Sequence, residues 1–362
     1  MPLLAYKPTA EDVMARLREL YARRAGDSIF ATMAVPNAAL DAFAKHYGDG
    51  FCEYPDPQER IEFWDRYYGQ RAVVEDDAIP AAYPSEMDEG LYTGVLGANV
   101  QFLSHPDTGW ISSMAPPLLA DWSQLAGLHY DPAHPWNQRY RRQLEIFVEG
   151  SRGNFGITHF ILIDALNLCF ELVGATKTYL SLDECPDAVR QAIEFAYDLN
   201  VAIQETFFAH VPLLDGGTCS NMVQWIPGRI VSESVDPFHM TSVKYFEHWG
   251  REPVERILGH FDGGVVHIHG NGRHLLEAVS TIRGLKAIYL GNDKGFPPAF
   301  EVLSDLQRRC GDVPLVVQVD FDRFVEAIQQ HALPGGVFYN VTRVPDVAAA
   351  NRMMEKVRAY RR

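Results

Sequence analysis

The segment Val265-Val266-His267-Ile268-His269-Gly270-Asn271-Gly272-Arg273-His274 joins a short β-branched run to two histidines and a glycine-containing turn. Alternate side chains of a β-strand project from the same face of a sheet. His267 and His269 are therefore predicted to lie together at the end of one strand, where the chain turns into a helical pattern. Because ligands of α/β folds bind beyond the carboxyl ends of the strands, this segment predicts a functional site at a strand end.

From about residue 140 onward, short apolar segments alternate with amphipathic helical segments. Strands are predicted at residues 144–148, 178–182, 219–225, 265–269, 287–290, 315–319 and 337–339, and helices at 158–172, 187–210, 242–258, 274–282, 298–309, 322–331 and 346–360. This alternation indicates βαβ units and a parallel sheet. Both a (β/α)8 TIM barrel and an open doubly wound sheet satisfy it, and the number of strand–helix units and the chain length favour the barrel.

The first 140 residues have a different character. A helix is predicted at residues 10–24, and residues 30–140 are irregular and rich in proline, glycine, aromatic and acidic residues. Long loop-rich regions of this kind commonly cover a functional site. We expect a single domain, 1–362, in which residues 1–140 form a helix and loop-rich cap and residues 141–362 form the main part of the barrel.

Composition excludes several classes of protein. The 362-residue chain is 47% hydrophobic and carries a net charge of −15, which argues against a general binder of nucleic acids or anionic membranes. Its five cysteines are scattered and form no CxxC pair, which favours a reduced, cytoplasmic compartment. No apolar run is long enough for a signal peptide core or a membrane span. We expect a soluble cytoplasmic protein that acts on a small-molecule substrate.

Common catalytic motifs do not occur in the sequence. The turn Gly270-Asn271-Gly272 lacks the third glycine of a dinucleotide loop, since position 275 is Leu275. Walker A, G-x-S-x-G and HExxH patterns are also absent. The sequence therefore excludes these nucleotide-binding, hydrolase and metalloprotease signatures.

Polar residues follow most of the predicted strands and would meet at one mouth of a barrel. They are Trp225 with Arg229, then His267, His269 and Asn271, Asn292-Asp293, Gln318 with Asp320, and Asn340 with Thr342. Two residues of the N-terminal region, Asp88 and Tyr92, are predicted to approach the mouth from above. We expect substrate contacts from Asp88, Tyr92, Trp225, Arg229, Asn271, Asn292, Gln318 and Asn340.

The histidine pair allows three interpretations: hydrogen-bonded structural histidines, ligands of a divalent metal ion, or a general acid–base pair. The loop Ser232–Met240 precedes the next predicted helix and would bring further polar side chains to the same mouth. In it, Asp236 and His239 complete a predicted catalytic cluster with His267 and His269, although Asp236 also suits a helix cap. If a metal binds, Glu233, Asp236 or His239 is the expected third ligand.

Several segments in consistent order resemble the uroporphyrinogen decarboxylase superfamily, which also contains methyltransferases related to cobalamin and coenzyme M. The resemblance covers roughly residues 115–360 and rests on Gly174–Pro186, Asp236, Met240–Glu247, Val266–Asn271, Leu285–Leu290 and Pro334–Tyr339. It implies a (β/α)8 barrel, an active site at the carboxyl mouth and a homodimer.

Two departures from the superfamily pattern narrow the expected activity. The decarboxylases open with an Arg-Gln-Ala-Gly-Arg-like segment that grips carboxylates, whereas this chain reads Ala31-Thr32-Met33-Ala34-Val35-Pro36-Asn37. The zinc-dependent methyltransferases use His-x-Cys and a late cysteine, whereas this chain has His267-x-His269 and the late turn Tyr339-Asn340-Val341-Thr342. The resemblance therefore implies a zinc site that is only partly kept.

Three functions are compatible with these residues and with the resemblance. The favoured one is methyl transfer from an O-, N- or S-methyl donor, assisted by Zn²⁺ at His267 and His269, with a corrinoid on a partner protein as a candidate acceptor. The second is a metal-independent decarboxylase or lyase, in which Asp236 and the histidines stabilise a cation or donate a proton. The third is a barrel that binds a tetrapyrrole or corrinoid without chemistry.

Overall fold

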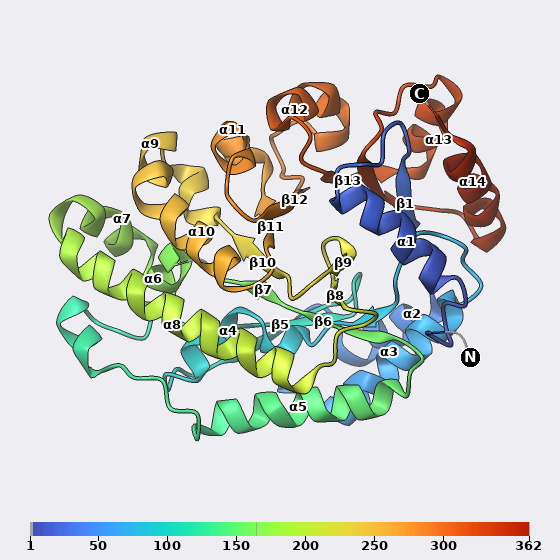
Figure 1. Ribbon diagram of the computed structural model, residues 1–362. Coiled ribbons are helices and arrows are strands. Elements are labelled where there is room, and N and C mark those ends of the chain that lie inside the picture. Colours follow the sequence, from blue (N-terminus) through green and yellow to red (C-terminus); the bar gives the residue numbers. More distant parts are fainter. Residues whose placement is uncertain (1–2, 164, 362) are drawn as a thin grey trace.

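The computed structural model describes residues 3–163 and 165–361, and its main feature is a curved sheet of seven parallel strands (Figure 1). The strands lie in the order β1-β14-β13-β12-β11-β10-β7. Their bounds are β1 (Phe30–Met33), β7 (Ile161–Leu162), β10 (Val231–Ser234), β11 (Gly264–Ile268), β12 (Leu285–Leu290), β13 (Leu315–Asp320) and β14 (Val337–Thr342).

The α-helices lie mainly around the outside of the strands (Figure 1). They are α1 (Ala10–Tyr21), α2 (Ala38–Tyr47), α3 (Pro57–Arg71), α4 (Glu89–Gly94), α5 (Pro135–Ser151), α6 (Ala165–Val173), α7 (Ala175–Glu184), α8 (Pro186–His210), α9 (Val243–Tyr245), α10 (Arg251–His260), α11 (Leu276–Ser280), α12 (Leu303–Cys310), α13 (Phe321–Gln329) and α14 (Val347–Ala359). The 3₁₀ helices are η1 (Ser85–Met87), η2 (Trp122–Gly127), η3 (Asp236–Met240), η5 (Gly270–Leu275) and η6 (Ala299–Val302), and η4 (Phe246–Gly250) is a π-helix. Within the described residues, every helix is too short or too polar to cross a bilayer.

Both faces of the central sheet are buried, as parallel sheets require. On the outer face, Val266 belongs to the large hydrophobic core shared with the surrounding helices. On the inner face, Val265 packs in a second core with Met14 and Leu17 of α1 and with Trp225. Helix α1 carries its apolar side chains at helical spacing, so one buried stripe covers the inner core.

A second, smaller sheet continues the first, but the two do not form a ring. Its strands are β3 (Ala81–Ala82), β6 (Gly156–His159), β8 (Gly217–Ser220) and β9 (Gln224–Pro227), in the order β3-β6-β8-β9. Among the described residues, no ladder joins β1 to β3. The predicted closed (β/α)8 barrel is not confirmed; the structure shows an α/β fold with a central seven-stranded parallel sheet.

Two buried carboxylates stand where a ladder between β1 and β3 would lie. Asp76 Oδ2 accepts a hydrogen bond from the backbone N–H of Met33 (2.8 Å), and Asp77 Oδ2 accepts one from that of Ala31 (3.0 Å). Lys7 Nζ lies 3.2 Å from Asp76 Oδ1, and Arg71 Nη2 lies 2.7 Å from Asp76 Oδ2. Burial would raise the pKa of Asp76, but Arg71, Lys7 and the hydrogen bonds lower it overall. Side chains therefore satisfy backbone groups of β1 that a neighbouring strand would otherwise pair.

The N-terminal third contributes both to the central sheet and to a separate antiparallel sheet. Its strand β1 pairs in parallel with β14. The strands β2 (Gly50–Cys52), β4 (Gln101–His105) and β5 (Trp110–Met114) form an antiparallel sheet in the order β2-β4-β5. The turn between β4 and β5 lines a cavity together with α3 and the carboxyl ends of β1 and β14. This part of the chain thus covers that side of the mouth.

Several segments differ from the prediction. Residues 144–148 lie inside α5, and residues 178–182 lie inside α7. The predicted helix 158–172 begins as strands β6 and β7 and becomes helical only at Ala165. Short apolar runs fit both a buried strand and a buried helix face, and their periodicity does not separate the two.

Candidate functional site

Asp236, His267 and His269 converge at the carboxyl ends of β10 and β11. His267 and His269 project from the same face of the strand, and their ring centroids lie 4.3 Å apart. Asp236 begins η3, directly after β10, which pairs in parallel with β11. One ligand atom from each of the three side chains lies within 4.8 Å of the other two. The two-residue strand period and the parallel neighbour therefore bring together three of the four residues predicted as a cluster.

Asp293, which follows β12, fixes the orientation of His269. Its Oδ1 lies 2.9 Å from Nδ1 of His269, and its Oδ2 accepts a hydrogen bond from the backbone N–H of Gly270 (2.6 Å). Nε2 of His269 consequently faces Asp236, whose Oδ2 lies 3.7 Å away. Partial burial opposes ionisation of Asp293, but hydrogen bonds from His269 and from backbone amides lower its pKa overall. An ionised Asp293 holds a proton on Nδ1, which leaves the Nε2 lone pair available.

The neighbouring imidazoles are neutral near pH 7. Burial lowers the pKa of His267 to about 3, and electrostatic interactions with His269 and His239 contribute to the shift. Burial also lowers the pKa of His239 to about 4, with a further contribution from His269 and His274. A neutral imidazole offers a lone pair to a metal ion or a proton.

His239 lies beside the three-residue group rather than within it. Its side chain is buried, its Nδ1 lies 3.5 Å from Asp236 Oδ1, and its ring centroid lies 5.7 Å from that of His269. Neither Nε2 of His239 nor Oδ1 of Asp236 has a hydrogen-bond partner in the described structure. Buried polar atoms without partners are uncommon in proteins, and they mark this as a place where a ligand would be accommodated.

Glycines leave the space that the histidines occupy. A Cβ atom on Gly291 would lie 3.0 Å from Nε2 of His267 and 3.3 Å from Nδ1 of His269. A Cβ atom on Gly272 would collide with the imidazole of His239. The packing of His239 thus requires a glycine at position 272, and a side chain at position 291 would press against His267 and His269.

Glu89 of α4 lies close enough to Asp236 for their charges to interact, and Glu171 of α6 in turn interacts with Glu89. Reduced solvation, followed by the charge of Asp236, raises the pKa of Glu89. Burial, followed by the charge of Glu89, raises the pKa of Glu171 to about 7. Neither Glu89 nor Glu171 was predicted from the sequence, although Asp88, the neighbour of Glu89, was.

Four predicted substrate contacts lie at or just beyond the carboxyl ends of the strands. Asn292 and Gln318 line one hollow of about 190 Å³. Asn340 accepts a hydrogen bond from Thr32 Oγ1 (2.9 Å) and lines a different cavity. Asn271 lies in η5, next to the histidine pair, and its Oδ1 has no hydrogen-bond partner in the described structure.

Trp225 and Arg229 do not reach this mouth, which corrects their prediction as substrate contacts. Residues 217–227 form an antiparallel hairpin, β8–β9, so the chain returns toward the amino ends of the strands. Trp225 is buried against α1 in the inner core. Arg229 immediately precedes β10 and pairs with Glu205 (2.5 Å).

Glu233 also lies apart from the cluster, although it was predicted as a metal ligand. In the ladder it pairs with Val266 of the outer core, whereas Ser234 pairs with His267. Its side chain therefore belongs to the opposite face of the sheet. In the N-terminal region, Tyr92 is buried against Phe160, with ring centroids 6.2 Å apart. Asp88 Oδ1 accepts hydrogen bonds from N–H and Oγ of Ser113 (2.8 Å each), which gives Asp88 a structural role.

Comparisons with known proteins support the fold. No family model and no curated protein matches the sequence. The structure is similar to that of a methyltransferase from Methanosarcina mazei, with a TM-score of 0.60. The match covers 96% of this chain and 98% of that chain, at 13% sequence identity. At this identity the likeness shows a shared fold.

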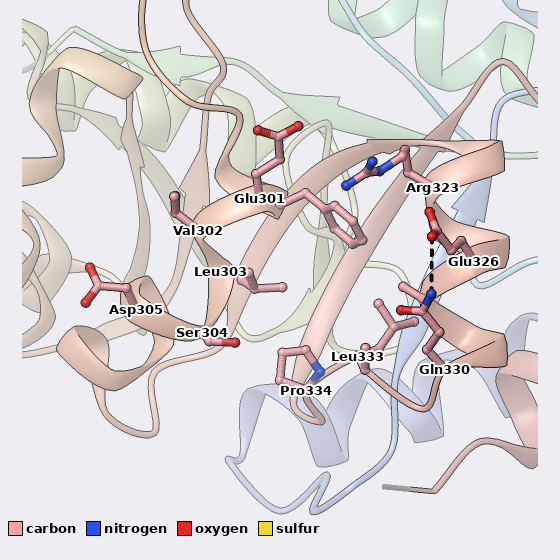
Figure 2. A pocket seen from close by; sticks show the side chains of 13 residues that line it. Glu301, Val302, Leu303, Ser304, Asp305, Arg323, Glu326, Gln330, Leu333 and Pro334 are labelled. Atoms are coloured by element: carbon pink, nitrogen blue, oxygen red, sulfur yellow. Dashed lines mark hydrogen bonds between the residues drawn. The ribbon is translucent and has the colours of Figure 1, made fainter.

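A larger hollow of about 450 Å³ lies between η6, α12 and α13 (Figure 2). Arg323 and Glu326 of α13 and Gln330, which directly follows α13, line it, and Glu326 accepts a hydrogen bond from Gln330 (3.1 Å). Glu301 and Leu303 lie on the other side. None of the residues of the histidine site lines this hollow, so size alone does not identify the functional site.

Proposed function

We propose that the protein is an enzyme that transfers a methyl group from an O-, N- or S-methyl donor with the help of a divalent metal ion. The observation that carries this proposal is the convergence of Asp236, His267 and His269, with His269 oriented by Asp293. A methyltransferase with the same fold supports the reaction class.

The residues present fit zinc. Two imidazole nitrogens and one carboxylate oxygen leave a fourth position open, which is typical of catalytic zinc sites. Metal-ligating histidines commonly hold a carboxylate on the other ring nitrogen, as His269 does with Asp293. Asp236 Oδ1 has no hydrogen-bond partner in the described residues, and His267 is neutral at physiological pH. We therefore assign Asp236, His267 and His269 as the ligands of this proposed site.

Zinc would supply Lewis acidity toward a leaving group or a thiol. The chain supplies orientation and proton handling. Asp293 keeps the proton of His269 on Nδ1 and fixes the ring. Glu171, with a pKa of about 7, is suited to hold or release a proton near neutral pH. A corrinoid on a partner protein as the acceptor, and a homodimer, are proposed from the resemblance in sequence.

The arginines do not favour the alternative of a decarboxylase. Arg229 lies at the amino end of β10, and Arg273 is buried with its guanidinium on the carbonyl oxygens of Pro297 and Gly291. Neither arginine is thus placed to grip a substrate carboxylate. Carboxylates such as Glu89 and Asp236 would repel an anionic substrate at this edge.

The proposal is tested by incubating zinc-loaded protein with reduced cobalamin and, in turn, aryl methyl ethers, methylamines and methyl thioethers. Formation of methylcobalamin, followed by absorbance, is the expected result with one of these classes. The His267→Ala/His269→Ala double variant should lose at least about 100-fold in rate, since removal of a metal ligand removes the Lewis acid. Release of carbon dioxide from carboxylated substrates without methyl transfer would contradict the proposal.

A further inference from the structure

A second cavity lies at the opposite side of the mouth from the histidines. It has a volume of about 360 Å³ and is lined by the carboxyl ends of β1 and β14, by α3 and by the turn between β4 and β5. Strand β14 lies three positions from β11 in the order of the central sheet. Because Thr32 of β1 and Ala81 of β3 both line the cavity, it adjoins the gap between these two strands. Its size suits a small organic molecule.

Aromatic side chains form much of its wall. Trp64 and Tyr68 of α3 stack with ring centroids 5.6 Å apart, and Tyr83 and Trp110 meet edge to face at 5.0 Å. Tyr67 is the fifth aromatic residue of the lining. Trp64 and Tyr83 are buried, whereas Tyr67, Tyr68 and Trp110 are partly exposed and can pack against another flat ring, in the geometries that aromatic pairs favour.

Polar atoms of the lining lack partners inside the protein. Within the described residues, Nε1 of Trp64, Oγ1 of Thr158 and Oδ1 of Asn221 are buried and make no hydrogen bond. Trp64 and Thr158 are 3% and 2% exposed, so bulk water does not satisfy them. Leaving a buried donor or acceptor unpaired costs free energy, and a ligand with matching groups would recover it. The protein thus presents one N–H donor, one amide oxygen acceptor and one hydroxyl, so a matching ligand must carry an acceptor for the N–H or a donor for the amide oxygen, and a hydroxyl group provides both.

The charge of the lining selects against anions. It contains no lysine, arginine or histidine, and its one ionisable acid is Asp107, in the exposed turn between β4 and β5. A carboxylate or phosphate placed here would lose its water without gaining a counter-ion. An uncharged molecule is therefore preferred.

We propose that this cavity binds an uncharged aromatic molecule that carries a hydroxyl or carbonyl group. The inference concerns binding in this cavity, whose lining contains none of the residues of the histidine site, and it is independent of any metal. Three features of the lining support this ligand class: its aromatic rings, its unpartnered polar atoms and its lack of cationic side chains.

The test uses 2-naphthol, which is neutral at pH 7, its anionic analogue 2-naphthoate and its saturated analogue 2-decalol. Isothermal titration of the full-length protein should show binding of 2-naphthol only. Trp64→Phe keeps the ring and removes the N–H, and Thr158→Val removes an unpaired hydroxyl at nearly constant shape. Each should weaken binding by about five-fold, the effect of one hydrogen bond.

Two controls locate the binding site. Trp122→Phe changes a tryptophan outside the cavity, whose Nε1 donates to Ser181 Oγ (2.8 Å), and should leave the affinity for 2-naphthol unchanged. His267→Ala/His269→Ala should also keep it, so that failure of the metal proposal and failure of this one are distinguishable. Absence of 2-naphthol binding, equal binding of 2-naphthoate, or equal effects of Trp64→Phe and Trp122→Phe would overturn the inference. Thr158→Val should fold normally, because it removes a buried hydroxyl that has no hydrogen-bond partner in the described structure. Weaker binding in this variant would therefore reflect the loss of a contact with 2-naphthol.

Discussion

Asp293 decides which nitrogen of His269 faces the proposed metal. Its Oδ1 lies 2.9 Å from Nδ1, and its Oδ2 is held by the backbone N–H of Gly270. Asp293→Ala should weaken zinc affinity by about 10- to 100-fold, as loss of such supporting carboxylates does in known zinc sites. Competition with a chromophoric chelator measures this affinity. Asp312→Ala, which alters an exposed carboxylate paired with Arg23, should leave it unchanged. Equal affinities in the two variants would contradict the role given to Asp293.

The grouping of His267, His269 and Asp236 could be predicted from sequence, because it needs only the strand period and a parallel neighbour. The position of Glu233 could not. A shift of one residue in register moves a side chain to the other face, and the sequence does not give the register of β10 against β11. Glu171 could not be found either, because its pKa of about 7 arises from burial and from Glu89, far away in the chain.

At the scale of elements, the contact between β1 and the segment before β3 depends on Asp76. This carboxylate accepts a hydrogen bond from the backbone of Met33 and lies against Lys7 and Arg71. Asp76→Ala would leave Lys7 buried without its counter-ion and should lower the free energy of unfolding by about 3–5 kcal/mol. Urea unfolding measures the change.

The matched control for Asp76 is Asp215→Ala, which breaks an exposed pair with Arg18. That change should cost less than about 1 kcal/mol, since exposed ion pairs contribute little. A loss of similar size in both variants would show that Asp76 has no special part in holding β1.

His159 joins β6, β8 and β10. Its Nδ1 lies 3.2 Å from the carbonyl oxygen of Cys219, and its Nε2 lies 2.9 Å from Oγ of Ser232. Burial lowers the pKa of His159 to about 4. Between the unfolded pKa of about 6.5 and the folded pKa of about 4, the unfolded chain binds a proton at this position and the folded chain does not. The free energy of unfolding therefore falls as the pH falls, and His159 accounts for roughly 3 kcal/mol of the loss between pH 7 and pH 4.

His159→Gln keeps a polar side chain but removes the titration. Urea unfolding at a series of pH values should therefore show a shallower loss of stability for the variant than for the wild type on the acid side. Parallel curves would mean that His159 is not buried as a neutral imidazole.

Element types followed from the sequence where segments were long and periodic, as in α8 and the strands β11 to β14. The β8–β9 hairpin was missed because residues 219–225 read as one continuous strand, whereas the chain reverses at residues 221–223. Trp225 and Arg229 were consequently assigned to the wrong end of the sheet. The reversal depends on a local turn, and Gln224 adopts a left-handed conformation there (φ 69°) that its residue type does not predict.

At the scale of the whole molecule, alternating apolar and amphipathic segments were enough to predict a parallel α/β fold. The sequence could not predict that the sheet stays open between β1 and β3, because the side chains of Asp76 and Asp77 accept hydrogen bonds from the backbone of β1 there, and no strand pattern marks this. The short strand Phe30–Met33 was also hidden within the irregular N-terminal region, yet it pairs with β14 at the other end of the chain.

The decisive measurement for the proposed metal site is the zinc content of purified protein after dialysis against zinc and then against buffer, determined by mass spectrometry. The wild type should retain about one zinc per chain, as a three-ligand protein site with an open position does. His267→Ala/His269→Ala should retain almost none. His46→Ala/His260→Ala, which removes two histidines outside the site, should retain as much as the wild type. Zinc-free wild type, or equal zinc in the two double variants, would contradict the assignment of Asp236, His267 and His269 as a metal site.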